Sequence, residues 1–278
     1  MAPRLPLELV ERIIDDVAKY DDNRDPIGNF SSIKACALVC HCFLPLCRKY
    51  IFASVIIKPA RHLIPPISDS LNRLLSNSPH LAVYIRKLDY FVDEEEFVAE
   101  RIPWLLPMFK KLVKLQKLSI TSCGCMPEKL DWMSSSARKV LLPLLRLPTL
   151  TSISLSSIRN FPLADLASCV NLKKLRILFL QWNSRTNSVG KFSEALSPTP
   201  VMLERLTIED AGNFIPVQQL CLAQRPDGKP IIDFSSLKKI KSTSVELRSL
   251  SELFGMCRNL QRINLYSMSL SHLISSSI

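Results

Sequence analysis

One spacing recurs along most of the chain and limits what it can fold into. An apolar residue is followed by another three positions later, and by a third two positions after that. The middle apolar residues of the seven matches lie 22 to 35 residues apart, room for a short strand, a helix and loops. The matches are Ile85/Leu88/Tyr90, Leu115/Leu118/Ile120, Leu150/Ile153/Leu155, Leu172/Leu175/Ile177, Leu203/Leu206/Ile208, Leu237/Ile240 with Ser242 in the last place, and Leu260/Ile263/Leu265.

A unit of this size cannot bury its apolar strand face by itself, so the units must stack on one another. The pattern therefore predicts an α/β fold in which parallel strands form a curved sheet and helices line its outer side. The alternative is an irregular α/β domain in which the matches are coincidental. Because the last match ends close to residue 278, we also expect an exposed edge strand there.

The first fifty residues have a different, helical periodicity. Leu5, Leu9, Ile13 and Val17 recur every four residues, and Pro6 falls in the opening turn, where a missing N–H costs nothing. A second helical run contains Cys36, Val39, Cys40 and Phe43, and Pro45 predicts a break before a short run that ends at Phe52. Short helices like these bury little surface and are marginal alone.

These residues carry a resemblance. Leu5-Pro6-x-Glu8-Leu9-x-x-x-Ile13, then Leu38-Val39-Cys40-x-x-Phe43-x-x-Leu46-x-Arg48 with a closing Ile51-Phe52, resembles an F-box. Phe43 stands where many members have Trp, and the segment between the two halves is longer than usual. Leu115-x-x-Leu118-x-Ile120-x-x-Cys123 is similar to a leucine-rich repeat. The resemblance implies an F-box-like helical module at 1–57, a helical connector at 58–80, and an irregular leucine-rich-repeat solenoid of about seven repeats at 81–278.

The F-box resemblance also implies a partner. F-box modules bind the Skp-type adaptor of cullin–RING ubiquitin ligases. The adaptor-binding residues that it indicates are Leu5, Pro6, Leu9, Ile13, Val39, Cys40 and Phe43. The alternative for each is packing among the helices of the module, and a stripe this wide can serve both purposes.

The residue before each middle apolar position points to the opposite face of its strand. These seven residues are Lys87, Lys117, Ser152, Lys174, Arg205, Lys239 and Arg262, six of them basic. The next outward row adds Arg176 and Lys241. We hypothesise that Lys87, Lys117, Lys174, Arg176, Arg205, Lys239, Lys241 and Arg262 bind an acidic or phosphorylated segment of a protein substrate on the concave face. The alternative is a solvated row of strand-start cations.

The charge distribution places the basic surface outside the helical module. Residues 1–60 have eight Lys or Arg against seven Asp or Glu, so nearly all of the net charge of +11 lies in the rest of the chain. A basic chain raises nucleic acid as a ligand, but the outward rows offer few aromatic residues besides Phe91 and Tyr266. We therefore expect no specific nucleic-acid binding.

The sequence has no apolar run long enough to cross a membrane and no secretory leader. Nine cysteines without framework spacing indicate reduced thiols in the cytosol or nucleus. The densest group contains Cys36, Cys40, His41, Cys42 and Cys47. It lacks the paired spacing of a structural zinc site, so core packing is the better interpretation. We expect neither a metal nor a cofactor.

Enzyme motifs are lacking as well. The sequence contains no Gly-x-Ser-x-Gly elbow and no glycine-rich phosphate loop, and its four histidines show no nucleophile–base arrangement. The resemblance to an F-box with leucine-rich repeats implies a non-catalytic substrate adaptor of a Skp–cullin–F-box ubiquitin ligase. Two alternatives remain: a ligase-independent repeat scaffold for protein interactions, and a hydrolase with dispersed catalytic residues.

Overall fold

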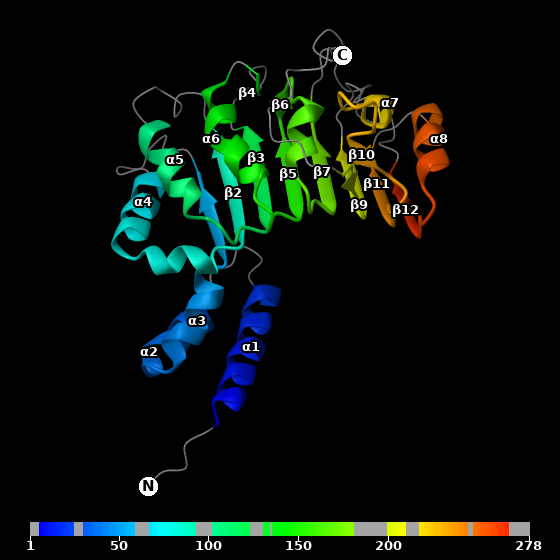
Figure 1. Ribbon diagram of the computed structural model, residues 1–278. Helices are drawn as coiled ribbons and strands as arrows, with labels where there is room; N and C mark the ends of the chain where they lie inside the picture. The colour runs from blue at the N-terminus through cyan, green and yellow to red at the C-terminus, as the bar shows by residue number, and fades with distance from the viewer. Residues whose placement is uncertain are drawn as a thin grey trace, which may run out of the picture.

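The computed structural model describes residues 6–24, 30–58, 67–92, 102–122, 130–133, 135–180, 199–209, 217–243 and 247–266. Three N-terminal helices precede a large parallel sheet that is flanked by further helices (Figure 1). The N-terminal helices are α1 (Leu7–Arg24), α2 (Ser31–Val39) and α3 (Phe43–Ile51), and we call them the helical module. Directly after α3 the chain enters β1 (Ser54–Ile57), the first strand of the sheet.

The helical module has a small core of its own. Its buried apolar residues are Val10, Ile14, Ala18, Ile33 and Cys47. They come from all three helices, and Val17, Phe43 and Tyr50 pack around them in partly buried positions. This cluster is separate from the core of the sheet.

The break between the second and third helices differs from the prediction. It was expected at Pro45, but α2 ends at Val39 and α3 begins at Phe43. Pro45 therefore lies in the first turn of α3, where the missing N–H has no helical acceptor to lose and the ring does not clash. The prediction of a break at Pro45 is wrong for that reason.

Eight parallel strands form the large sheet in the order β1-β2-β3-β5-β7-β9-β11-β12. Each strand pairs with the one that precedes it in this series, so the order in space follows the order in the chain. The remaining seven strands are β2 (Lys87–Val92), β3 (Lys117–Ser122), β5 (Ser152–Ser156), β7 (Lys174–Leu178), β9 (Arg205–Glu209), β11 (Lys239–Ser242) and β12 (Arg262–Leu265). This mixed α/β arrangement is compatible with a solenoid.

The register of the sheet follows the repeated sequence pattern. The middle apolar residues of the seven matches pair with one another from strand to strand, beginning with Leu88 opposite Leu118 and ending with Ile240 opposite Ile263. From β2 to β11 these residues are almost completely buried. The outward residues before them are consequently in register too, from Lys87 to Arg262.

The first strand was not expected from the sequence. In β1, Val55 pairs with Leu88, and the side chain of Ile57 is fully buried in the core of the sheet. Phe52, Val55 and Ile57 have the same spacing as the seven matches, so the signal was present. It was hidden because Phe52 ends the short helical run and residues 53–57 fall inside the helical module predicted at 1–57.

The starts of the strands share one backbone arrangement. The carbonyl of the residue before each strand accepts hydrogen bonds from two consecutive N–H groups of the next strand start, at 2.8–3.1 Å. Arg86, for example, accepts from Gln116 and Lys117. The seven acceptors are Ala53, Arg86, Gln116, Thr151, Lys173, Glu204 and Lys238. We call this arrangement, one carbonyl that accepts two consecutive N–H groups, the joint between two units, and it is the same at all seven positions.

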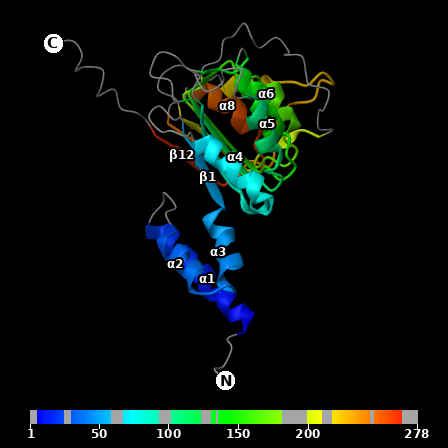
Figure 2. The same cartoon turned by 90° about the vertical axis from the view of Figure 1, so that its left-hand side faces the viewer.

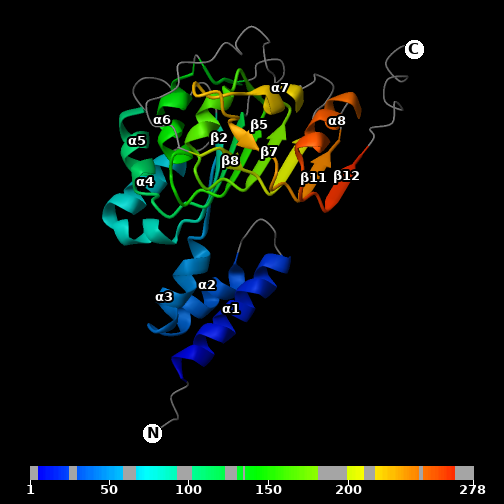
Figure 3. The same cartoon turned by 45° about the vertical axis from the view of Figure 1, so that its right-hand side comes forward.

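Beyond the helical module, the helices that the structure describes all lie on one face of the sheet, and none of them covers the opposite face, which we call the open face (Figures 2 and 3). The covering elements are α4 (Ile67–Asn77), η1 (Pro79–Tyr84), α5 (Ile102–Lys110), α6 (Ser136–Leu145), η3 (Leu163–Ser168), α7 (Val217–Leu222) and α8 (Leu247–Met256). Two short ladders join the connections: β4 (Leu130–Asp131) with β6 (Ile158–Arg159), and β8 (Val201–Met202) with β10 (Ile232–Asp233). Between the helices and the sheet lies one continuous core of 47 buried apolar residues among those described.

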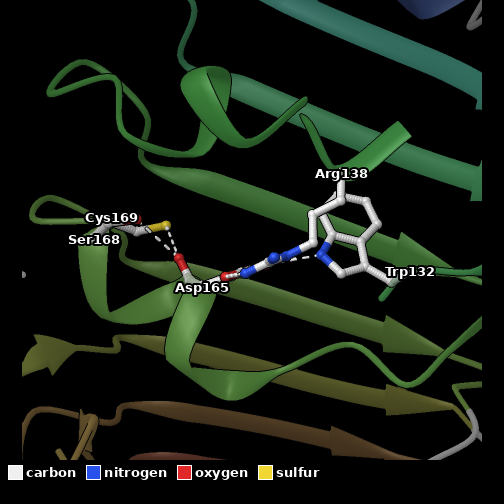
Figure 4. A network of polar contacts seen from close by, with 5 residues as sticks. All are labelled: Trp132, Arg138, Asp165, Ser168 and Cys169. Atoms are coloured by element: carbon white, nitrogen blue, oxygen red, sulfur yellow. Dashed lines mark hydrogen bonds and ion pairs between the residues drawn. The ribbon is translucent and has the colours of Figure 1, made fainter. Parts of the chain in front are cut away.

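A buried carboxylate ties two of the covering elements together (Figure 4). Asp165 of η3 is 4% exposed and accepts a hydrogen bond from Trp132 Nε1 at 2.8 Å. Arg138 of α6 donates to both of its oxygens, from Nε at 2.9 Å and Nη2 at 2.8 Å. These bonds raise the pKa of Arg138 above its already high value. Since the carboxylate is satisfied on both oxygens, its burial is compensated.

Candidate functional site

The helical module presents apolar side chains to solvent. In α1, Leu9 is 47% and Ile13 49% exposed, while Ile14, the residue next to Ile13, is fully buried. In α2, Leu38 is 88% and Val39 70% exposed. We call Leu7, Leu9, Ile13, Leu38 and Val39 the exposed apolar set, since each of them is more than a third exposed. These five side chains on α1 and α2 are the candidates of the module for contact with a partner.

The seven residues predicted to bind the adaptor fall into three groups. Pro6, Leu9, Ile13 and Val39 are exposed, and they are therefore free to contact a partner. Cys40 and Phe43 are half-buried, and Phe43 packs against the core of the module. Leu5 lies outside the described residues.

Two members of the exposed apolar set, Leu7 and Leu38, were not predicted. Leu38 was missed because the apolar spacing of the second helical run was assigned to Cys36, Val39, Cys40 and Phe43, which leaves Leu38 out. The helix instead turns Ile33 into the core, with Cys36 and Ala37 packed around it. Spacings of three and four residues from Ile33 would have identified this face, and with it the exposure of Leu38.

A polar contact fixes α1 against α3. Tyr50 donates a hydrogen bond from Oη to Asp15 Oδ1, and Lys49 Nζ lies 2.8 Å from the same oxygen. The hydrogen bonds from Lys49 and Tyr50 lower the pKa of Asp15 below its ordinary value of 3.8. The bond to Asp15 raises the pKa of Lys49. This contact orients the helix that carries Leu9 and Ile13.

Two thiols meet at the turn between α2 and α3. Cys40 Sγ lies 2.9 Å from Cys42 Sγ, and both cysteines are free. The hydrogen bond between them lowers the pKa of Cys40 and raises the pKa of Cys42. Of the group for which core packing was predicted, Cys47 is buried in the core of the module and Cys36 packs against it, but His41 and Cys42 are exposed and Cys40 is half-buried. Among the described residues, no group of three His, Cys, Asp or Glu side chains could hold a metal ion.

The open face of the sheet, opposite the helices, carries the second candidate surface. Lys174, Arg205, Lys239 and Arg262 occupy the same register position on four adjacent strands, β7, β9, β11 and β12. Neighbouring strands lie about 4.8 Å apart. Lys117 occupies this position two strands earlier, with Ser152 between it and Lys174. We call these five residues the basic row.

The basic row has no ion pair with any residue that the structure describes, whereas other predicted cations do. Lys87 Nζ lies 2.6 Å from Asp89 Oδ2 on its own strand. Lys241 Nζ lies 2.8 Å from Glu209 Oε1, and Arg176 Nη2 lies 3.3 Å from Glu209 Oε2. The eight predicted cations thus divide into five members of the basic row and three that already have an acidic partner.

Glu209 was not anticipated, and it changes the chemistry of the face. The hydrogen bond from Lys241, with the nearby charge of Arg176, lowers the pKa of Glu209 below its ordinary value of 4.5. The carboxylate therefore stays ionised and holds both cations. Glu209 lies one position beyond Ile208 of the repeat, on the outward side of β9, so strand alternation could have revealed it.

Four closely spaced cations can bind an anionic group, because each repels its neighbours and gains from a shared counter-charge. Carboxylates and phosphates both fit this chemistry.

Within the described part of the chain, no helix is long and apolar enough to span a bilayer. Comparison of the chain with protein-family models, with curated proteins and with solved structures gives no match.

Proposed function

We propose that this chain is a non-catalytic substrate-recognition subunit of a Skp–cullin–F-box ubiquitin ligase. In this proposal α1 to α3 form an F-box-like module that binds the Skp-type adaptor, and the units that follow form a leucine-rich-repeat solenoid that binds the target protein. The observation that supports it most is the division of α1 into two faces. Val10 and Ile14 hold the module together, while Leu9 and Ile13 remain exposed for a partner.

The burial expected on docking is large enough for a stable complex. Each exposed apolar side chain that leaves water contributes about 1.5–3 kcal/mol if it is fully buried, before the costs of association. Holding a substrate on the same chain raises its effective concentration near the conjugating enzyme, so this subunit needs no catalytic residues. We place this activity in the cytosol or nucleus, which is where its cysteines would stay reduced.

The substrate in this proposal is a protein segment with carboxylate or phosphate groups, bound on the basic row. We propose no cofactor, and no specific binding of nucleic acid. The five cations of the row lack described acidic partners, which supports an external anionic ligand over a merely solvated row.

The adaptor proposal is tested by co-precipitation of the purified chain with a purified Skp-type adaptor. The Leu9→Asp/Ile13→Asp double variant should lose binding by at least 100-fold and keep its circular dichroism spectrum, because both side chains are exposed. Val113→Asp is a matched control: Val113 is also 49% exposed, but it lies before β3, away from the helical module. No binding by a folded wild-type chain would refute the proposal.

The substrate proposal needs a separate test. The Lys117→Glu/Lys174→Glu/Lys239→Glu variant should lose capture of an acidic or phosphorylated target and keep adaptor binding. A variant with Lys110, Lys114 and Lys139 replaced by Glu changes the net charge equally with exposed lysines from α5, α6 and the turn before β3. Equal capture by the two triple variants would contradict a role for the basic row.

One observation favours a second candidate function, a ligase-independent scaffold. Only Phe52 and Ala53 separate α3 from β1, and the carbonyl of Ala53 accepts the N–H groups of Arg86 and Lys87. The helical module therefore continues directly into the first strand of the sheet. A folded chain that binds no adaptor but still captures a partner through the open face would support this candidate.

A further inference from the structure

The last strand of the sheet is exposed in a way that the others are not. In β12, Ile263 is 46% and Leu265 48% exposed. Their register partners on β11, Ile240 and Ser242, are only 1% and 2% exposed. Among the described strands, β12 pairs with β11 alone. The two apolar side chains therefore extend the inner face of the sheet beyond the last strand that the structure describes.

The backbone of β12 has free hydrogen-bonding groups at this edge. The N–H groups of Arg262 and Tyr266 donate to Lys238 O at 3.0 Å and Ser242 O at 2.9 Å, toward β11. In a parallel strand, alternate residues turn their N–H and C=O groups to opposite neighbours. Ile263 and Leu265 therefore direct their N–H and C=O groups away from β11. An added strand would find two donors and two acceptors there.

Within the part of the chain that the structure describes, β12 has few of the usual protections of an edge strand. Natural edges carry proline, a bulge, several charges or a covering element. β12 has neither a proline nor a bulge in its register with β11, and Arg262 is its only charged residue. β1, at the opposite edge, has half-buried or buried side chains throughout and follows directly on α3.

The positive charge next to this edge determines which side chains an added strand can carry. The basic row ends on β12 at Arg262, after Lys174, Arg205 and Lys239 on the three preceding strands. A ninth strand in the same register would place one side chain beside Arg262. A lysine or arginine would extend a row of like charges, and an aspartate or glutamate would relieve it. The following positions would lie beside Ile263, Asn264 and Leu265.

We propose that β12 captures an extended segment of a partner protein as a ninth parallel strand. The segment carries an acidic residue beside Arg262, then an apolar, a polar and an apolar residue beside the remainder of the strand. This is recognition by strand addition, in which backbone bonds supply affinity and alternate side chains supply specificity. The proposal rests on the substrate-binding part of the proposed function and states the conformation and pattern of the bound segment.

Two other occupants fit the edge less well. The twelve residues after Tyr266 contain no Asp or Glu, so they offer no partner for Arg262. A second copy of the chain brings a further net charge of +11 and the same uncompensated row. An acidic segment from another protein has neither disadvantage.

The test uses the full chain and a fluorescein-labelled peptide, Ser-Glu-Val-Thr-Val-Thr-Ser, with a second peptide in which lysine replaces the glutamate. Fluorescence anisotropy should show that the first peptide binds at least ten-fold more tightly than the second. Slower hydrogen exchange at the amides of Ile263 and Leu265 on binding would place the peptide at the edge. No binding of the first peptide at millimolar concentration would overturn the proposal.

Variants separate strand addition from simple attraction. Leu265→Pro removes an N–H that points away from β11 and should reduce binding at least ten-fold, while Leu265→Val keeps that N–H and should bind normally. Arg262→Glu should reverse the preference and favour the lysine peptide. Equal binding by the proline and valine variants would refute strand addition. The Arg262→Glu result remains informative even if the proline variant fails to fold.

The other occupants give distinct results, and each would overturn the proposal. If the chain's own tail covers the edge, the peptide will bind only after the residues following Tyr266 are deleted. If a second copy covers it, sedimentation will show a dimer that Leu265→Pro dissociates. None of these measurements involves the adaptor, so a failure here leaves adaptor binding by α1 to α3 untouched, and the reverse also holds.

Discussion

The helical module and the sheet domain contain similar kinds of apolar residues and use them differently. The module buries five apolar residues and leaves Leu9, Ile13 and Val39 exposed. Among the described residues, the sheet domain has one core of 47 apolar residues, because from β1 to β11 each unit covers the inner face of its neighbour. The comparison teaches that stacked units cover one another's apolar residues, whereas the three short helices leave several of theirs in water.

The largest expected effect comes from a pair of adjacent residues in α1. Ile14→Asp puts a carboxylate into the five-residue core and should cost about 4 kcal/mol or more, enough to unfold the module. Ile13→Asp should leave the module folded, because Ile13 is exposed. Circular dichroism should lose helical signal only in the first variant.

Tryptophan fluorescence gives the control for this comparison. Trp104, Trp132 and Trp182 all lie outside the module, so fluorescence reports on the sheet domain alone. The urea transition measured this way should be unchanged in both variants. If Ile14→Asp shifted the urea midpoint measured by fluorescence as much as the midpoint measured by circular dichroism, the two cores would unfold as a single cooperative unit. The distinction between the module and the sheet domain would then be wrong.

A second variant sharpens the comparison from the side of the sheet. Asp165→Ala leaves Arg138 and Trp132 without their shared partner and should lower the free energy of unfolding by about 3 kcal/mol. This is the low end of the usual range, because the Arg138 side chain is 27% exposed and can regain water. Urea unfolding followed by fluorescence measures it.

The control for this variant is the Asp165→Ala/Arg138→Ala double variant. The loss in its free energy of unfolding should be smaller than the sum of the losses in the two single variants. The reason is that the double variant has no buried or half-buried charge without a partner, whereas each single variant does. Adaptor binding should be unchanged throughout. Additive losses would mean that Arg138 and Asp165 contribute independently.

A smaller effect is expected on the open face. Glu209→Gln releases Lys241 and Arg176, which should then be available to an external anion. Binding of an acidic peptide should tighten by a few-fold, in line with exposed ion pairs that are worth up to about 1 kcal/mol. Glu204→Gln is the control, because Glu204 pairs with Lys173 and Lys238 at longer distances of 3.4 and 3.9 Å. Unchanged binding by Glu209→Gln would show that these two cations take no part.

The smallest effect concerns acid. The pKa of Asp15 in the folded module is below 3.8, so its stabilising contribution is complete above that value and is lost as the pH falls through the folded pKa. The stability of the module, measured as urea unfolding followed by the helical circular dichroism signal, should therefore fall below about pH 4. Asp15→Asn should remove this part of the pH dependence. A variant with the same acid sensitivity as wild type would assign the effect to other carboxylates.

The sequence predicted the sheet better than the module. Strand positions and register followed from the spacing around Leu88, Leu118 and Leu175, because a stacked unit repeats its burial pattern and the repeats can be compared with one another. The strand at Val55 was missed although it has the same spacing, since its residues also fitted a helical interpretation.

The helical module offered no such internal comparison. Leu9 and Val10 are both apolar, and the sequence alone does not say which of them faces the core. The tertiary packing of Ile33 and Cys47 decides it. Likewise, the outward cations could be predicted from alternation, but the pairing of Arg176 and Lys241 with Glu209 depends on which side chains reach one another across the strands.

The shared joints between units have a consequence for how such a chain can change in length. At each joint, one carbonyl receives two N–H groups in the same geometry, whether the acceptor is Arg86 or Lys238. A whole unit could be duplicated or excised at these points, and the flanking segments would still meet matching donors and acceptors. The extent of the open face is therefore a quantity that evolution or an engineer can adjust in steps of one unit, without redesigning the rest.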